Sequence, residues 1–265
     1  ADQTEIGPLN APGLVNVRAP IMRFWKVTLT ATTTVKLRAK YSGGTVGDFT
    51  VKQTNSGIFA WQAGGASLSA PTIVAVGASA SGTGAVVPGL PTGHTTNDIL
   101  RLYVQSSNET VAAPAGWARL GPVGGFGAAA AAGSTRVTIF WKRDGGAESD
   151  PTVADPGDHA LAIIDAVRGC VTTGDPFLNV GAYKPKTTAS TTATGVAGAT
   201  PVDNCLVTQV FGHALDSATA VFSSPVNADL TSVTEQIDVA TADGTGGGIG
   251  VITGVKAAAG SFAAT

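Results

Sequence analysis

The stretch that decides the fold is "DILRLYVQSS" at residues 98–107, followed by "PAGWARLG" at 114–121 and "TRVTIFWKR" at 135–143. In the first and third segments polar and apolar residues alternate, as they do in a β-strand that presents successive side chains to opposite faces of a sheet. The Pro-Gly pair before Trp117 is typical of a tight turn. The three segments therefore predict strands on either side of a Pro-Gly-Trp turn.

Further segments of the same kind follow along the chain. They are short, rich in Val, Ile, Thr and Ala, and separated by turn residues, and they lie at 72–80, 159–169, 203–213, 232–242 and 247–256. The segment "HALAIIDAVRG" at 159–169 also fits a short buried helix. We expect a central strand instead, because the segment is short and is bounded by Gly157 and Gly169.

Seven or more short strands with turn signals between them predict an all-β fold. We expect an antiparallel β-sandwich, jelly-roll-like, over residues 71–265. The final "KAAAGSFAAT" (256–265) has the pattern of a hairpin turn that leads into a strand. A sandwich strand without its continuation leaves a neighbouring edge unpaired, so we expect either a further strand in the native protein or a neighbouring subunit over the gap.

Residues 1–70 predict a separate, smaller region. Residues 1–20 contain three prolines and little periodicity, which is typical either of an extended arm that lies on a neighbouring subunit or of a poorly ordered terminus. The segment "VKLRAKY" at 35–41 has the period-two pattern of a half-buried strand, and 21–31 is its expected partner. Two more short strands are expected at 48–53 and 57–62. We interpret this region as a β-rich attachment part, with a boundary near residue 70.

The composition excludes several classes of function. Hydrophobic residues make up 43% of the 265 residues and charged residues only 13%, with a net charge of −2. Without a basic stripe the chain lacks the electrostatic attraction that nucleic-acid binding needs. No run of about eighteen apolar residues predicts a membrane span. The first residues also lack the charged and apolar regions of an uncleaved signal peptide.

The cysteines and histidines predict no metal or redox site. Cys170 and Cys205 are expected to be buried free thiols, and the alternative is one disulfide between strands. The histidines are spread along the chain without the spacing of a metal site, and we expect them at the surface or the rim of the fold; they are His94, His159 and His213.

The acidic and glycine-rich segments are candidates for binding chemistry. Asp150, Asp155 and Asp158 share one loop, which fits either calcium or a plain Asp-Pro turn. "GTGGGIG" at 244–250 lacks the register and the lysine of a phosphate-binding loop, so we expect a turn followed by a strand. No nucleophile elbow occurs, and the few glutamates suggest no acid pair. We therefore predict no catalytic, cofactor-binding or metal-binding residues, and no cofactor.

The tryptophans have two readings. The indole of Trp117 follows a fixed turn, and we expect it to cap one end of the sandwich by packing. The alternative is a platform on which a sugar ring stacks. Trp61 and Trp141 are interpreted in the same way, and Trp25 is expected near a subunit contact.

The order of motifs from residue 71 to about 255 resembles a group of bacteriophage virion proteins. In that group a "GD-lL-v" strand, a "P-GW" turn, a "vfwK" strand and an "a-i-a-rG" strand follow one another. Here "ND-IL-RLYV", "PAGWARL", "RVTIFWKRD" and "DHALAIIDAVRG" take these places, with Asn97-Asp98 instead of Gly-Asp. The resemblance covers about the C-terminal two-thirds of the chain. It implies a capsid-decoration, tail-fibre or baseplate component located in the virion, and it brings no catalytic residues.

The leading expectation is therefore a non-enzymatic virion structural protein that forms a homo-oligomer, with a trimer as the first guess, and binds other virion proteins such as major capsid or tail proteins. An extracellular carbohydrate-binding or adhesin module is the alternative, with Trp117, Trp61 and the loop aspartates as its site. An enzyme of lyase or glycosidase type is the third.

Overall fold

The computed structural model describes residues 69–107, 109–127, 135–181, 183–184 and 190–265 with their side chains, and the backbone of three short strands before them. The chain divides into two compact units, Ala1–Gly65 and Ala66–Thr265. All regular elements among the described residues are β-strands, which confirms the all-β prediction.

The first unit contains a small sheet in the order β1-β2-β3. Its strands are β1 (Leu14–Asn16), β2 (Val35–Ala39) and β3 (Gly47–Val51). β2 pairs with β1 in parallel and with β3 in the antiparallel sense. β2 and β3 overlap the strands expected at 35–41 and 48–53. The strands expected at 21–31 and 57–62 lie outside the described residues.

The second unit contains a seven-stranded antiparallel sheet in the order β4-β10-β6-β9-β7. β5 pairs with β10 on the same side as β4, and β8 pairs with β9 on the same side as β7. The strands are β4 (Thr72–Val76), β5 (Ala80–Gly82), β6 (Ile99–Ser106), β7 (Ala118–Leu120), β8 (Phe126–Gly127), β9 (Arg136–Arg143) and β10 (Ala160–Arg168). β10 lies between β6 and the β4–β5 edge, so the segment 159–169 forms a central strand as expected.

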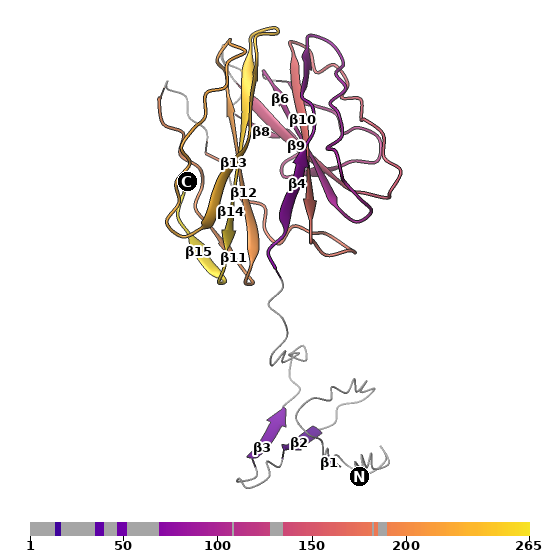
Figure 1. The fold of residues 1–265 in the computed structure, drawn as a ribbon, viewed down its shortest axis with the longest axis vertical. Helices are drawn as coiled ribbons and strands as arrows, with labels where there is room; N and C mark the ends of the chain where they lie inside the picture. Colours follow the sequence, from indigo (N-terminus) through magenta and orange to yellow (C-terminus); the bar gives the residue numbers. More distant parts are fainter. Residues whose placement is uncertain are drawn as a thin grey trace. The chain divides into compact units, whose positions relative to one another are not determined.

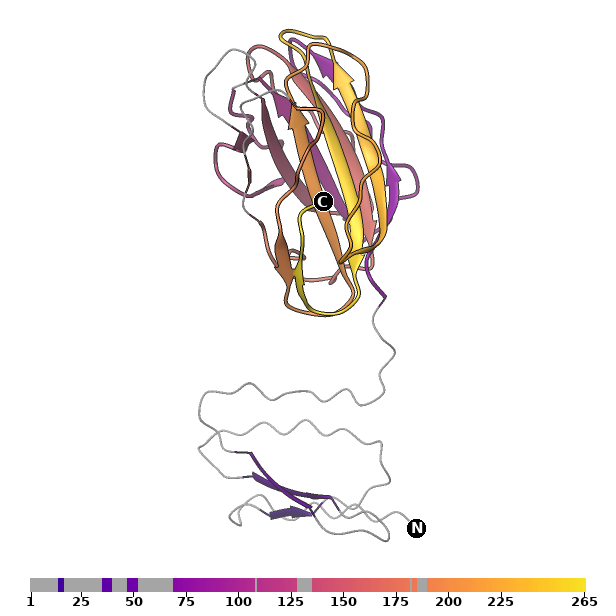
Figure 2. The ribbon, with the colours of Figure 1, turned by 90° about the vertical axis from the view of Figure 1, so that its left-hand side faces the viewer.

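A second, three-stranded antiparallel sheet has the order β12-β14-β13. Its strands are β12 (Cys205–His213), β13 (Thr231–Thr241) and β14 (Gly247–Lys256). Figure 1 shows this sheet facing the seven-stranded one, and in Figure 2 its face is toward the viewer, in front of the seven-stranded sheet. Two short strands, β11 (Gly198–Thr200) and β15 (Gly260–Phe262), form a separate antiparallel pair.

The space between the two large sheets is filled by apolar side chains from both. The seven-stranded sheet contributes Tyr103, Val137, Ile139, Leu161 and Ile163, and the three-stranded sheet contributes Ile237, Ile249 and Val251. Burial of such side chains is the main favourable term in folding. The described part of the second unit is therefore a sandwich of antiparallel sheets.

The opposite face of the seven-stranded sheet is also buried. Leu100, Leu102 and Val104 of β6 point into a second cluster with Phe140 of β9 and with loop residues that include Val86, Val111, Trp117 and Val153. The alternation in 98–107 thus separates two buried faces, and β6 is buried along its whole length. Its polar residues Arg101 and Gln105 face the other sheet and are almost inaccessible, with 6% and 0% of their surface exposed.

Glycines in β14 let a long loop lie against the outer face of the three-stranded sheet. A Cβ at Gly250 would stand 2.4 Å from the ring of Phe222, which comes from the loop before β13. The turn between β13 and β14 uses two left-handed glycines, Gly244 with φ 56° and Gly246 with φ 73°. The prediction of a turn followed by a strand at 244–250 is confirmed.

The last described strand has its partner within the same chain. The turn and strand expected at 256–265 are present as the residues after β14 and as β15. β15 pairs with β11 of the same chain.

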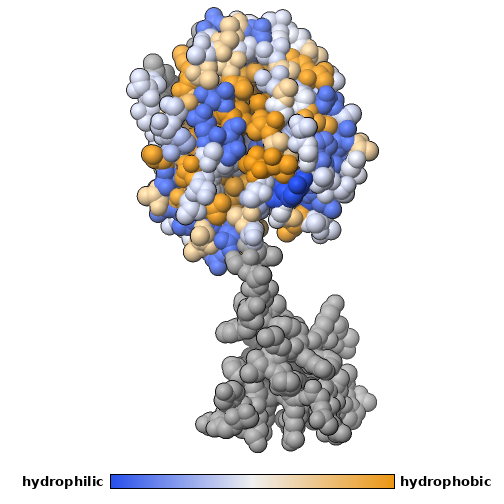
Figure 3. Space-filling view, in the orientation of Figure 1, coloured by the Kyte–Doolittle hydropathy of each residue, from blue (hydrophilic) through white to orange (hydrophobic). Residues whose placement is uncertain are grey.

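The surface of the second unit mixes polar and apolar side chains. Figure 3 shows apolar side chains gathered among polar ones near the centre of the face in view. No helix in the described ranges has the length and apolar character to cross a membrane. The exposed large apolar residues are Val87, Val123, Val171, Leu178, Val180, Tyr183, Val202, Leu215, Val221 and Val226.

Candidate functional site

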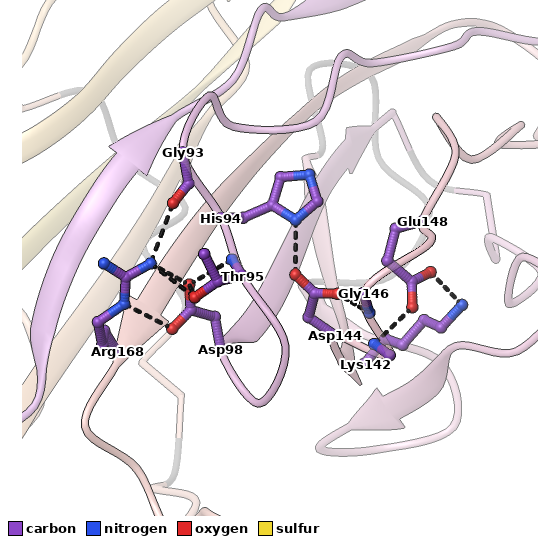
Figure 4. A network of polar contacts seen from close by, with 10 residues as sticks. Gly93, His94, Thr95, Asp98, Lys142, Asp144, Gly146, Glu148 and Arg168 are labelled. Atoms are coloured by element: carbon purple, nitrogen blue, oxygen red, sulfur yellow. Dashed lines mark hydrogen bonds and ion pairs between the residues drawn. The ribbon is translucent and has the colours of Figure 1, made fainter.

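A network of polar side chains lies at one end of the seven-stranded sheet, where β6 begins and β9 and β10 end (Figure 4). We call it the rim network, and its side chains are those of His94, Thr95, Asp98, Lys142, Asp144, Glu148 and Arg168. The antiparallel register places Ile99 opposite both Val167 and Arg143, so the ends of these three strands meet. The network gathers charged side chains at the ends of three strands, which makes it the candidate functional site.

Asp98 and Arg168 form the first half of the rim network. Arg168 Nε donates to Asp98 Oδ1 at 3.0 Å and its Nη2 to Oδ2 at 2.7 Å. Asp98 is almost fully buried, with 3% exposed, and also accepts a hydrogen bond of 2.8 Å from the backbone N–H of Thr95. Burial alone raises the pKa of Asp98, but these hydrogen bonds outweigh it and the pKa lies below its usual value. The carboxylate therefore stays charged and closes the turn that leads into β6.

His94 and Asp144 form the second half, next to the pair of Lys142 and Glu148. His94 Nδ1 lies 2.6 Å from Asp144 Oδ2, and the other oxygen of Asp144 accepts the backbone N–H of Gly146, also at 2.6 Å. Burial alone raises the pKa of Glu148, but the hydrogen bonds from Lys142 and from the backbone N–H of Gly145, with the charge of Lys142, together outweigh burial and lower the pKa. Each acid in the rim network thus has a basic partner.

The geometry of the rim network is that of a contact that holds two loops together, and it fits this role better than that of a reaction centre. The backbone of the two loops is also paired at this point, because Asp144 N donates to Asp98 O and Asn97 N donates to Asp144 O, both at 2.9 Å. Nowhere in the described ranges do three or more His, Cys, Asp or Glu side chains gather in a way that could hold a metal ion. The network holds the loop before β6 against the loop after β9.

A second polar group lies between the sheets, and sequence reasoning missed it. Arg101 and Asp165 form a two-point ion pair, Tyr103 donates to Asp165 at 3.2 Å, and Arg101 reaches Thr208 on β12 at 2.6 Å. Burial alone lowers the pKa of Arg101, but the charge of Asp165, its hydrogen bond and weaker interactions with neighbouring groups together outweigh burial and raise the pKa. Burial also raises the pKa of the Tyr103 hydroxyl well above its usual value. The sequence feature that could have indicated this group is the presence of an arginine and an aspartate, Arg101 and Asp165, within otherwise strongly apolar strands.

The three aspartates considered for calcium are separate. Asp150 accepts the backbone N–H of Leu90 at 2.8 Å, and Asp155 accepts that of Gly157 at 2.8 Å within its own turn. Asp158 accepts the backbone N–H of Thr245 at 2.8 Å. The plain-turn interpretation fits these contacts, because each carboxylate has its own backbone partner and no shared centre.

The same use of carboxylates recurs in the other loops of the sandwich. A carboxylate that accepts a backbone N–H fixes a loop without needing apolar burial, and the charged acceptor makes the hydrogen bond strong. The further pairs are Asp175 with Phe177, Asp203 with Ala259, Asp229 with Ala263, and Asp238 with Phe222.

The histidines differ in their surroundings, and the expectation for one of them was wrong. His94 is a rim residue, with 22% of its side chain exposed, and His213 is half-buried at the end of β12 beside Phe222. Burial lowers the pKa of His213. His159, expected at the surface or the rim, is fully buried between Asp158 and Gln105 because it starts a central strand.

The described tryptophans pack into the fold. Trp117 is 8% exposed and belongs to the cluster on the loop-covered face of the seven-stranded sheet, so the packing interpretation is confirmed and no sugar platform exists there. Trp141 is half-buried, with its ring edge-on to Phe177 at 5.4 Å. Trp25 and Trp61 lie outside the described residues.

The cysteines are free thiols, as expected. Cys205 is buried, whereas Cys170 is only partly buried, and burial raises the pKa of the Cys170 thiol. A raised pKa leaves little reactive thiolate at neutral pH.

Comparison with known proteins gives no relative from which a function follows. The chain matches no protein-family model, no curated protein and no solved structure.

Proposed function

We propose that the chain is a structural component of a bacteriophage virion, of the capsid-decoration or fibre type, and that it assembles as a homo-oligomer with other virion proteins. The order of strand and turn motifs over the C-terminal two-thirds of the sequence suggests this class. The jelly-roll character of the sandwich and the attachment role of residues 1–70 are part of the same proposal.

The observation that carries the proposal is the use of polar side chains to hold the fold together. The rim network fastens two loops, Arg101 and Asp165 join the sheets, and most aspartates of the sandwich hold backbone N–H groups of loops. Such an arrangement makes a rigid sandwich with long, fixed loops, which suits a building unit. Among the described residues we identify no set of side chains arranged around a reaction centre.

The segment 171–180 is the part of the surface that we assign to subunit contacts. It is fixed to the sandwich, because Arg143 donates to the carbonyls of Val171 and Gly174 and because Phe177 packs on Trp141. It nevertheless exposes large apolar side chains: Leu178 is 60% exposed and Val180 is 43% exposed. A fixed backbone that carries apolar side chains in solvent is typical of an interaction surface.

Light scattering on the purified full chain tests the assembly. We expect a mass that is a multiple of 26.3 kDa, and a shift to the monomer in the double variant Leu178→Lys, Val180→Lys. Val226→Lys is the matched control, since Val226 is 76% exposed elsewhere on the unit. A monomeric wild-type chain at high concentration contradicts the homo-oligomer.

Antibody labelling tests the virion location. Antibodies against the purified chain are applied to phage particles from the culture that carries its gene, and electron microscopy then shows whether the label lies on the head or the tail. Particles that carry no label, together with a chain that binds immobilised glycans, would instead support the carbohydrate-binding alternative.

A further inference from the structure

His159 lies in a chain of hydrogen bonds that connects the two sheets. Its Nε2 is 3.0 Å from Oε1 of Gln105 on β6, and its Nδ1 is 2.7 Å from Oδ2 of Asp158. The same oxygen of Asp158 accepts the backbone N–H and the hydroxyl of Thr245, both at 2.8 Å. Because Thr245 belongs to the turn between β13 and β14, this chain connects the seven-stranded sheet with the three-stranded sheet.

The other contacts of Gln105 fix the orientation of its amide. Its Nε2 donates to the backbone carbonyl of Ser106 and to Oγ1 of Thr135, both at 3.1 Å. A carbonyl oxygen only accepts hydrogen bonds, so the NH₂ group faces Ser106 and Oε1 faces His159. Since Oε1 is also only an acceptor, His159 Nε2 carries a proton.

The carboxylate on the other side of the ring requires a second proton. The hydrogen bond from His159, followed by those from Thr245, lowers the pKa of Asp158 to about 2. At neutral pH this carboxylate is ionised and has no hydrogen to donate. His159 Nδ1 is therefore the donor in the 2.7 Å contact, and both nitrogens of the ring carry protons.

We propose that His159 is a buried imidazolium whose two N–H groups hold the β13–β14 turn to the seven-stranded sheet, one through Asp158 and the other through Gln105. A neutral ring has a single N–H. It then presents a lone pair either to Gln105 Oε1 or to the Asp158 carboxylate, and one of the two contacts becomes repulsive. The proposal concerns the fold itself and does not depend on the proposed virion function.

Two carboxylates interact with His159. Asp158 precedes it and contacts its Nδ1, and Asp243 approaches from the β13–β14 turn. Hydrogen bonds from two hydroxyl groups and, less strongly, the charge of His159 lower the pKa of Asp243. Glu109, from the loop after β6, lies against the glycine two residues before His159. From β6 itself the ring faces the neutral amide of Gln105.

Nuclear magnetic resonance of the full chain, labelled with ¹⁵N at its three histidines, tests the protonation state. At pH 7 we expect both ring nitrogens of His159 to have the chemical shifts of protonated nitrogens and both N–H protons to be visible. His159→Gln assigns the signals by removing them, and His94→Gln is the control that leaves them unchanged. A single protonated nitrogen at pH 7 overturns the proposal, and this measurement needs only the unmodified chain.

Amide hydrogen exchange at Thr245 tests the link to the turn. We expect its protection to fall in His159→Gln, because the ring that holds Asp158 is removed, and in Asp158→Asn, because the carboxylate that accepts the Thr245 amide is removed. His94→Gln should leave the protection unchanged. Protection that persists in His159→Gln contradicts this role of the ring.

Discussion

Arg101 on β6 and Asp165 on β10 stand directly opposite each other in neighbouring strands and form an ion pair inside the sandwich. Arg101 Nε lies 2.8 Å from Asp165 Oδ1, and its Nη2 lies 2.6 Å from Oδ2. A further hydrogen bond of 2.6 Å reaches Thr208 on the other sheet. Two opposite charges are thus removed from water together, and each depends on the other for compensation.

Removal of one partner is therefore expected to destabilise the sandwich strongly. Asp165→Asn leaves the Arg101 charge buried, which costs about 3–5 kcal/mol, measured as the free energy of unfolding in denaturant. The double variant Arg101→Met, Asp165→Leu should recover much of this loss. Asp175→Asn, at an exposed turn, is the control. A loss below about 1 kcal/mol in Asp165→Asn would show that water or a rearranged neighbour compensates Arg101.

The strands could be predicted from the sequence because alternation at period two is a local property. The segments 98–107 and 159–169 form β6 and β10 in the structure. The short length of 159–169 and its flanking glycines were sufficient to choose a strand over a helix. The packing of Trp117 followed in the same way from the turn before it.

The polar groups between the sheets could not be predicted from the sequence. Alternation shows which residues share one face of a strand, but it does not show which element covers that face. Arg101 and Asp165 are 64 residues apart in sequence, and only the register of β6 and β10 brings them together. His159 was placed at the rim for the same reason, since a histidine at a strand end is usually near solvent. A third element, the β13–β14 turn, covers it here.

Acid is expected to weaken the link between Asp158 and Thr245. The pKa of Asp158 in the fold is about 2, below its usual 3.8, mainly because His159 and Thr245 donate hydrogen bonds to it. A lowered pKa means that this contribution to stability is fully present above about pH 4 and is lost as the pH falls toward 2. The unfolding midpoint should therefore fall less steeply over this window in Asp158→Asn than in Asp155→Asn. Equal slopes in the two variants would contradict the assignment.

Trp117 is expected to matter for stability and not for ligand binding. Trp117→Ala removes a large side chain that is 8% exposed in the cluster behind the seven-stranded sheet. Such a change costs about 3–5 kcal/mol, whereas Val226→Ala at a surface position should cost about 0.5 kcal/mol or less. Calorimetry on both variants measures the difference. A stable Trp117→Ala chain that has lost binding to a glycan would reverse the interpretation.

Gly250 on β14 is expected to decide whether the loop before β13 stays on the outer face of its sheet. In Gly250→Ala the new methyl group would stand 2.4 Å from the ring of Phe222, and Phe222 is itself held by a 2.7 Å hydrogen bond from its backbone N–H to Asp238. Because that hydrogen bond fixes the backbone of Phe222, the ring can clear the methyl group only by leaving its rotamer or by pulling the backbone away, so we expect a loss of about 1–3 kcal/mol together with faster hydrogen exchange at the Phe222 amide. Gly84→Ala is the matched control, because no atom lies within 4 Å of a Cβ placed there. Unchanged exchange at Phe222 in Gly250→Ala would mean that the loop accommodates the methyl group and that the glycine is not required for the contact.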